Sequence, residues 1–339
     1  MSAWIETPGG IALAPNGTIY FADSHNDVIL RRAPGGRDPY PVAGNYDLGT
    51  GFSGDHGPAV KAQLDTPDGV CIAPDGDLVI ADSHNDRIRR VDGPTRAITT
   101  IAGSGENGYD ADDQPATDAA LDTPNAVACA RNGDIYIADT MNNRIRMIDA
   151  KTGLIHTVAG DGTTGENGPI GDGGPATSAK LFMPSDVQLA PNGDIYVADM
   201  HHNRVRKVDA ASHIITTVAG NGTFGPGGDD GEATAASLAG PAGIAITPEP
   251  GGLMIFIADY YNGLVRAVGP DGIIRNVSDE GRAAFGAPTR VAFEPKSAWL
   301  YVADSSKDQV VALNIPRLAR NPFAALPRPL PTAPGRKAS

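Results

Sequence analysis

Cysteine is almost absent from this sequence, which contains only Cys71 and Cys129 among 339 residues. The chain is therefore not a disulfide-built scaffold. Cys71 stands four residues after Pro67, and Cys129 stands five residues after Pro124. Since side chains alternate between the two faces of a strand, the two cysteines are expected to face opposite ways. We therefore predict no disulfide between them.

Aromatic residues, basic charge and long apolar runs are also scarce. Aromatics make up 6% of the chain, and 27 Lys and Arg residues stand against 40 Asp and Glu, a net charge of −13. A chain this acidic is a poor general partner for nucleic acid, whose phosphates require a basic face. No apolar run approaches membrane-spanning length, so no membrane association is expected. The first residues lack the basic and apolar regions of a signal peptide, so we expect a cytoplasmic protein.

A sixfold repeat dominates what the sequence does contain. An apolar run ending in Ala-Asp recurs as IYFAD, LVIAD, IYIAD, IYVAD, IFIAD and LYVAD. A proline and a short apolar stretch precede each run, and turns such as Pro-Asn-Gly or Pro-Asp-Gly often separate the two, as in β-hairpins. The closing aspartates are Asp23, Asp82, Asp139, Asp199, Asp259 and Asp304. The opening prolines are Pro8, Pro67, Pro124, Pro184, Pro241 and Pro288.

Each repeat indicates one four-stranded antiparallel sheet. Third strands such as RIRRVD follow the Ala-Asp runs, and fourth strands such as ITTIAG follow those. Six such sheets stacked around an axis cover one another's faces and protect their edges. We therefore predict an all-β, six-bladed β-propeller over residues 1–315. A β-solenoid is disfavoured because its repeats are much shorter.

The end of the chain differs in composition from the repeats. The sixth repeat shows no obvious outermost strand, so we expect this strand to be weak, absent or made from chain-end residues. Residues 316–339 are rich in Pro and Arg and are predicted to form a disordered tail. Residues 328–334, RPLPTAP, match a ligand pattern of SH3 domains, so the alternative is a tail that binds a protein partner.

The segments ADSHNDRIRRVD, ADTMNNRIRMID and ADMHHNRVRKVD resemble the NHL repeat. The similarity spans roughly residues 8–315 and implies a six-bladed propeller, with distant similarity to peptide-amidating lyase and gluconolactonase-type propellers. Such a resemblance says little about activity, because the family includes lyases, hydrolase-like relatives and non-catalytic binding platforms.

Four long Gly-rich connectors precede the second to fifth repeats. They share a pattern ending in Ala-x-x-Ala-x-Leu or a close variant, usually after a proline, which favours a common packing role. Calcium binding is the alternative, because calcium prefers clustered carboxylates. Its candidate ligands in the connectors are Asp110, Asp112, Asp113, Asp172, Asp229 and Asp230.

Features shared by every repeat are expected to serve the fold. The six closing aspartates can accept loop N–H groups, and in the second to fourth repeats each can pair with the arginine five residues later. The third-strand arginines recur just as regularly and are also interpreted as structural. Function is expected where the six copies differ.

The loops after the second strands form one such asymmetric ring. Two residues past each closing aspartate lie His25, His84, Met141, His201, Tyr261 and Ser306. Neutral imidazoles are ligands for divalent metals, so we predict a metal held by some of His25, His84 and His201. His84, His201 and Tyr261 are the catalytic candidates. Alternatively, these side chains make only local loop contacts.

The residues directly after the opening prolines form a second asymmetric ring. Pro67-Asp68-Gly69 resembles the segment that supplies a metal carboxylate in gluconolactonase-type propellers, and Asn125 resembles their asparagine ligand. Gly9 stands where that resemblance calls for a glutamate. Asp68 and Asn125 are therefore additional metal-ligand candidates, or polar lining of a wet channel mouth.

Two functions remain open at this stage. One is a metal-assisted lyase or hydrolase, with zinc or calcium, that acts on a small-molecule substrate at the connector-bearing face. The other is a non-catalytic propeller that binds a protein or peptide across the same face. No GxSxG, P-loop, HExxH or zinc-finger pattern decides between them.

Overall fold

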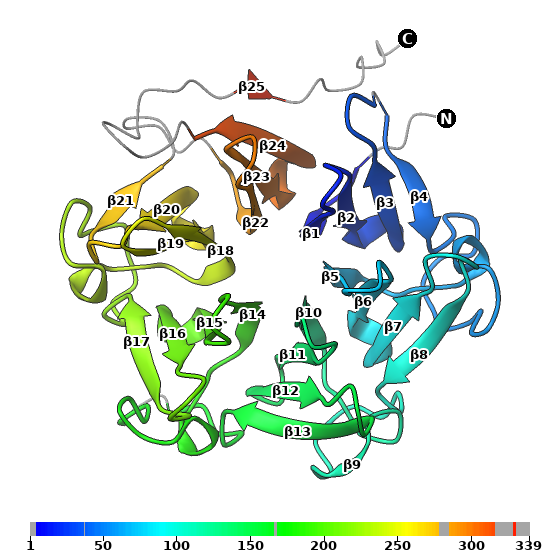
Figure 1. The fold of residues 1–339 in the computed structure, drawn as a ribbon, viewed down its shortest axis with the longest axis horizontal. Helices are drawn as coiled ribbons and strands as arrows, with labels where there is room; N and C mark the ends of the chain where they lie inside the picture. Colours follow the sequence, from blue (N-terminus) through cyan, green and yellow to red (C-terminus); the bar gives the residue numbers. More distant parts are fainter. Residues whose placement is uncertain (1–4, 37, 166–167, 278–284, 316–327, 330–339) are drawn as a thin grey trace.

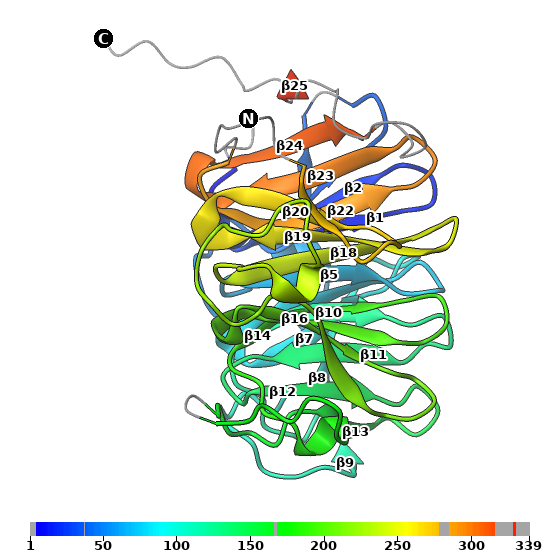
Figure 2. The ribbon, with the colours of Figure 1, turned by 90° about the vertical axis from the view of Figure 1, so that its left-hand side faces the viewer.

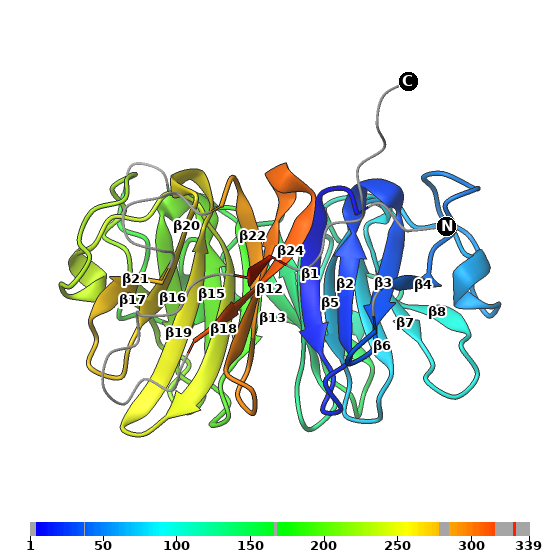
Figure 3. The same cartoon turned by 90° about the horizontal axis from the view of Figure 1, so that it is seen from above.

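A computed structural model of the chain describes residues 5–36, 38–165, 168–277 and 285–315, together with the strand Arg328–Pro329. Six antiparallel sheets stand radially around one axis, in chain order (Figure 1). We number these blades one to six. The predicted six-bladed propeller is confirmed, and Figures 2 and 3 show the disc edge-on, with the strands running between its two faces.

Within each blade the strands follow one another from the axis outward. The innermost strands all begin at an opening proline: β1 (Pro8–Leu13), β5 (Pro67–Ile72), β10 (Pro124–Cys129), β14 (Pro184–Leu189), β18 (Pro241–Glu249) and β22 (Pro288–Glu294). The second strands all end at a closing aspartate: β2 (Ile19–Asp23), β6 (Leu78–Asp82), β11 (Ile135–Asp139), β15 (Ile195–Asp199), β19 (Gly252–Asp259) and β23 (Trp299–Asp304).

The outer half of each blade contains the third and fourth strands. The third strands are β3 (Val28–Arg32), β7 (Arg87–Val91), β12 (Arg144–Ile148), β16 (Arg204–Val208), β20 (Leu264–Val268) and β24 (Gln309–Asn314). The fourth strands are β4 (Tyr40–Ala43), β8 (Ile98–Ala102), β13 (Leu154–Ala159), β17 (Ile215–Ala219), β21 (Ile274–Asn276) and β25 (Arg328–Pro329). Blade three gains a fifth strand from its connector, β9 (Gln114–Pro115).

Short 3-10 turns complete the structure. Five of them follow the second strands: η1 (Ser24–Asn26), η3 (Ser83–Asn85), η5 (Met200–His202), η7 (Tyr260–Asn262) and η8 (Ser305–Lys307). Three lie in the long connectors: η2 (Ala59–Lys61), η4 (Ala176–Ser178) and η6 (Ala233–Ala235). Each innermost strand begins where its second strand ends, as in the Pro8–Asp23 pair. We call the face of the disc where they meet the top face.

The hydrophobic core lies in layers between neighbouring blades, because alternate side chains of each sheet face the blade on either side. Val79 of blade two, for example, shares one buried cluster with Ile137 of blade three. Hydroxyl groups near the axis tie most blades to the next one by donating to an opening-proline carbonyl. These contacts are Ser24–Pro67, Ser83–Pro124, Thr140–Pro184, Ser185–Pro241 and Thr289–Pro8. The last of them joins blade six to blade one and so closes the ring.

The two cysteines form a disulfide between blades two and three, so the prediction that they stay unpaired was wrong. Their Cα atoms are 5.8 Å apart, and both pack against one interblade cluster. Cys71 lies opposite Val79, and Cys129 lies opposite Ile135. The cysteines do occupy opposite faces of their own sheets. Consecutive sheets are stacked, however, so the face of blade two that carries Cys71 confronts the face of blade three that carries Cys129.

The outermost strand of blade six comes from the end of the chain. This was one of the three alternatives expected from the sequence. Arg328 and Pro329 pair with Ala312 and Val311 of β24. The predictions of a disordered tail and of a peptide motif at residues 328–334 otherwise fall outside the described residues. Within the described ranges, no helix is long and apolar enough to cross a membrane. The cytoplasmic location stays a prediction, and the disulfide weighs against it because such bonds are typical of oxidising compartments.

Candidate functional site

The closing aspartates serve the fold, as predicted. Asp82 is fully buried, and its carboxylate accepts hydrogen bonds from the backbone N–H of Asp65 and from Asn85. It also accepts a 2.9 Å hydrogen bond from Arg89 Nη1, while Arg89 Nη2 lies 2.7 Å from Asp55 in the preceding connector. Arg89 is 0% exposed, so its guanidinium is a buried link between the strand end and the connector.

The same buried link recurs in blades three to five. In each of them an arginine joins a closing aspartate to a connector aspartate: Arg146 with Asp139 and Asp112, Arg206 with Asp199 and Asp172, and Arg266 with Asp259 and Asp229. Three of the six connector aspartates considered for calcium therefore pair with arginine. These contacts support the packing role of the connectors.

The arginine that pairs with the closing aspartate lies seven residues after it, not five, which corrects the predicted spacing. Arg87, five residues after Asp82, donates instead to the carbonyls of Asn85 and Ser104 and stacks on Phe52 at 3.8 Å. Arg87 is the first residue of β7 and lies at the end of the strand near the top face of the disc. Arg89 lies two residues further along β7, on the same side of the strand. Only the deeper position is enclosed by the connector.

Burial raises the pKa of several closing aspartates. It raises the pKa of Asp82, Asp139 and Asp259 to about 6, although the neighbouring arginines pull each pKa down. Asp23 of blade one has Leu30 at the corresponding arginine position. Burial raises the pKa of Asp23 further, to about 7, against hydrogen bonds from the Glu6 N–H and Asn26.

The three candidate metal-binding histidines lie at separate blade junctions. His25 Nε2 is 3.9 Å from a carboxylate oxygen of Glu6. His84 Nδ1 is 3.0 Å from Thr66 Oγ1, and the His201 ring packs edge-on against a phenylalanine ring of its own blade opening. Among the described residues, no three His, Cys, Asp or Glu side chains form a group that could hold a metal ion. The histidines thus make the local contacts of the alternative interpretation.

Arg290 of blade six occupies the mouth of the central channel. It is 6% exposed, and its Nη1 donates to the carbonyls of Ala242 and Thr289. Its Nη2 lies 3.2 Å from the Asp68 carboxylate and donates to the carbonyls of Asn125 and Ser185. One guanidinium therefore contacts blades two to six around the axis. It supplies a fixed positive charge where the sequence predicted a metal.

Asp68 and Asn125 lie at the axis as predicted, but their contacts there go to Arg290. The Asp68 carboxylate pairs with the guanidinium, and Asn125 contributes its backbone carbonyl. The residues predicted as metal ligands therefore do not form one donor set that fits a metal. The binding of a divalent cation itself stays a prediction.

Sequence reasoning missed Arg290 because it considered the residues directly after the opening prolines. The informative ring is one position further along: Gly10, Gly69, Ala126, Asp186, Gly243 and Arg290. Four small residues there leave space around the axis. A Cβ on Gly243, for example, would lie 2.8 Å from the Arg290 Cα. One acidic and one basic residue break this symmetry, and that contrast was readable from the sequence.

Asp186 provides a buried counter-charge near Arg290. Its carboxylate accepts hydrogen bonds from the N–H groups of Val187 and Ile244. Burial raises the pKa of Asp186 to about 6, and the charge of Arg290 opposes this shift. The channel mouth is thus filled by a polar cluster of one guanidinium and two carboxyl groups, those of Asp68 and Asp186.

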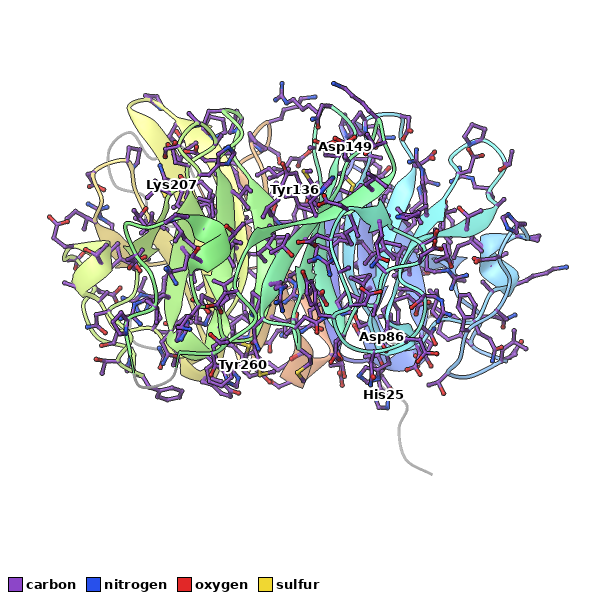
Figure 4. The ribbon with its side chains drawn as sticks, turned by 90° about the horizontal axis from the view of Figure 1, so that it is seen from below. His25, Asp86, Tyr136, Asp149, Lys207 and Tyr260 are labelled. Carbon is purple, nitrogen blue, oxygen red and sulfur yellow. A yellow bond between two sulfur atoms is a disulfide. The ribbon has the colours of Figure 1, made fainter. Side chains whose placement is uncertain are left out.

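The three predicted catalytic residues do not converge on one reacting centre. His84, His201 and Tyr261 belong to blades two, four and five, and blades two and five are opposite each other in the ring. Tyr261 is 57% exposed and packs edge-on against Tyr260 at 4.8 Å. Figure 4 shows His25, Asp86 and Tyr260 on one face of the disc and Asp149 toward the other. The histidines and tyrosines thus line an exposed surface.

Comparison with known sequences finds the NHL repeat. A family model for this repeat matches residues 64–90. The chain is 33% identical over 277 residues to the protein SUPPRESSOR OF QUENCHING 1, chloroplastic, from Arabidopsis thaliana, covering 78% of this chain and 25% of that protein. It is 31% identical over 207 residues to NHL repeat-containing protein 2 of Bos taurus, covering 56% of this chain and 27% of that protein. The chain spans about a quarter of the length of these curated relatives.

Solved structures with the same fold include enzymes and binding proteins. A streptogramin B lyase matches with a TM-score of 0.59 at 14% identity, covering 98% of this chain and 86% of that one. An auxiliary nutrient binding protein from Bacteroides thetaiotaomicron matches with a TM-score of 0.64 at 12% identity, covering 91% and 68%. A gluconolactonase from Xanthomonas campestris matches with a TM-score of 0.56 at 13% identity, covering 88% and 83%. At these identities the likeness concerns the fold alone.

Proposed function

Because the chain belongs to the NHL-repeat family of six-bladed propellers, we propose that it is a non-catalytic propeller that binds a protein or peptide across its top face. The observation that carries this proposal is the contact set of Arg290. Its guanidinium contacts Asp68 and four carbonyls around the axis, where a catalytic metal would need open ligands. A ligand that approaches the axis from the top face therefore meets the guanidinium of Arg290 and its partners.

The competing function is a metal-assisted lyase or hydrolase acting on a small molecule. It would require His84 and His201 to act together with Asp68, but these side chains contact different neighbours at different blades. The fold itself is compatible with either function, since both lyases and a nutrient binding protein share it. The local contacts at the top face favour binding.

A peptide library displayed on phage tests the proposal. Clones selected on the native protein are screened again on two top-face variants, Met141→Arg and Tyr261→Arg, whose original side chains are exposed. The matched control is Asn132→Arg, in the exposed turn between β10 and β11 at the opposite face. We expect enriched clones to lose binding to at least one top-face variant and to keep binding to the control. Clones that bind all three variants equally would contradict a top-face platform.

A further inference from the structure

The top face has an aromatic half at the openings of blades four and five. Phe224 is 63% exposed, and its ring centroid lies 5.7 Å from that of Tyr261. His201 and Phe182 pair at 4.7 Å on the neighbouring junction. We call Phe182, His201, Phe224, Tyr260 and Tyr261 the aromatic patch. Phe224 and Tyr261 are the two most exposed Phe, Tyr or Trp side chains among the described residues, while Phe182 and Tyr260 are half-buried beneath the same surface.

The rings of the aromatic patch are held in place by contacts with their own loops. A Cβ added to Gly240 would lie 2.6 Å from the Tyr261 ring and 3.5 Å from Met200 Cε, so both side chains cover the same glycine. The Tyr261 N–H donates to the Ala239 carbonyl, and the His201 N–H donates to the carbonyl of Phe182. Ordered rings lose little entropy when a ligand side chain packs against them.

The other half of the top face is acidic. At the junctions that open blades one, two and three, a carboxylate two residues before the proline stands beside the carboxylate that ends the preceding blade's turn. The three pairs are Glu6 with Asp308, Asp65 with Asp27, and Asp122 with Asp86. We call these six residues the acidic crescent. At the next two junctions the same two positions hold Phe182 with Asn143 and Ala239 with Asn203, so the charge ends where the aromatic patch begins.

The acidic crescent concentrates negative charge that is only partly compensated by local hydrogen bonds. Burial raises the pKa of Asp27 and of Asp86, and the neighbouring Asp65 and Asp122 raise them further. The exposed His25 and His84 rings lie beside the crescent, close to Glu6 and Asp65. Additional positive charge from a ligand would therefore be stabilised here.

The two halves lie on opposite sides of the channel mouth that Arg290 occupies. Blades one and two face blades four and five across the axis (Figure 1), so a ligand can span both halves without entering the channel. We infer that the top face recognises a peptide segment with a large apolar anchor for the aromatic patch and several Lys or Arg residues for the acidic crescent. This inference rests on the proposed binding function and specifies the chemistry of the ligand.

Synthetic peptides test this recognition directly. The probe is an acetylated peptide with one tryptophan near its N-terminus, a Gly-Ser spacer and three arginines near its C-terminus. Two matched peptides replace the arginines by glutamates or the tryptophan by alanine. Binding to the full chain is measured by titration calorimetry at low salt and at about 0.3 M salt, where exposed charges are screened.

We expect the probe to bind, the tryptophan-to-alanine peptide to bind about tenfold more weakly, and the glutamate peptide not to bind. Phe224→Ala with Tyr261→Ala should weaken probe binding about tenfold. Asp65→Asn with Asp122→Asn should weaken it several-fold and reduce its salt dependence.

Two control variants keep the top face intact. Tyr40→Ala removes an exposed ring from the outer edge of blade one, and Asp149→Asn with Glu249→Gln removes two carboxylates at the face opposite the crescent. Both should bind the probe as the native protein does. Equal binding of the arginine and glutamate peptides, or no effect of the top-face variants, would overturn the inference. If the phage clones still depend on the top face in that case, the binding platform stands and only its ligand chemistry is wrong.

Discussion

Blades two to five and blades one and six follow the same strand plan but anchor their closing aspartates differently. In blades two to five the aspartate pairs with a buried arginine that also reaches an aspartate of a long connector. Blades one and six have Leu30 and Val311 at the arginine position. The arginine is therefore not required to build a blade. It fastens a connector, and it occurs in the four blades that a long Gly-rich connector precedes.

The two groups of blades also stabilise the buried carboxylate of the closing aspartate in different ways. Asp23 relies on hydrogen bonds from the Glu6 N–H and from Asn26. Asp82 adds an arginine that is itself fully buried. Removing one member of a buried ion pair leaves an uncompensated charge, which costs more than losing a neutral hydrogen bond.

The largest expected effect comes from breaking a buried link. Asp82→Ala leaves Arg89 buried with only Asp55 as an ionic partner, so we expect the free energy of unfolding to fall by about 3–5 kcal/mol. Asp23→Ala strands no buried charge and should cost about 1–3 kcal/mol. Urea unfolding of both variants measures the difference. An equal or larger loss for Asp23→Ala would contradict the distinction between the two groups of blades.

The junction between blades two and three should also be stabilised covalently. The Cys71–Cys129 disulfide joins residues 58 apart in sequence. Cys71→Ser with Cys129→Ser should lower the free energy of unfolding by about 2–4 kcal/mol. A reductant should destabilise the native protein by a similar amount and leave the double variant unchanged, which thermal unfolding can show. A native protein that is insensitive to the reductant and contains two free thiols would contradict the pairing.

The smallest expected effect is a difference in proton affinity between the two groups. The pKa is about 7 for Asp23 and about 6 for Asp82, both above the ordinary value of 3.8. Each carboxyl thus binds its proton more tightly in the folded state. The raised pKa therefore adds to the free energy of unfolding in full below about pH 4. This contribution is lost as the pH rises through 6 for Asp82 and through 7 for Asp23.

Carboxyl-detected NMR titration measures these two midpoints. Leu30→Arg places a cation where blades two to five have one and should lower the pKa of Asp23. Leu30→Met, which adds no charge, is the matched control and should leave that midpoint near 7. A higher midpoint for Asp82 than for Asp23 would show that the arginine does not set the difference.

The sequence was sufficient for the fold because each blade repeats a local pattern. Opening prolines, hairpin turns and Ala-Asp endings lie within a few residues of one another, so the strand order follows from the chain order. The structural role of the closing aspartates also followed from their occurrence in all six copies. The predicted partner of Asp82 was wrong by two residues because strand periodicity does not reveal that Arg89, rather than Arg87, is enclosed by the connector.

The candidate site was harder to predict because it depends on contacts across the ring. Arg290 pairs with Asp68, which lies 222 positions earlier in the chain, and no local pattern links the two. Cys71 and Cys129 were misjudged for a similar reason, since strand alternation describes one sheet and not the stacking of two. The single Arg and the single Asp in an otherwise small-residue ring were the available sequence signal.

A cation titration of the native protein tests most directly whether Arg290, rather than a metal, occupies the channel mouth. Metal-free native protein is titrated calorimetrically with zinc and with calcium, alongside the variants Asp68→Asn and His84→Ala. We predict no stoichiometric binding that depends on Asp68 in the native protein. One equivalent of metal bound by the native protein and lost in both Asp68→Asn and His84→Ala would contradict the closed mouth and favour the metal-assisted enzyme.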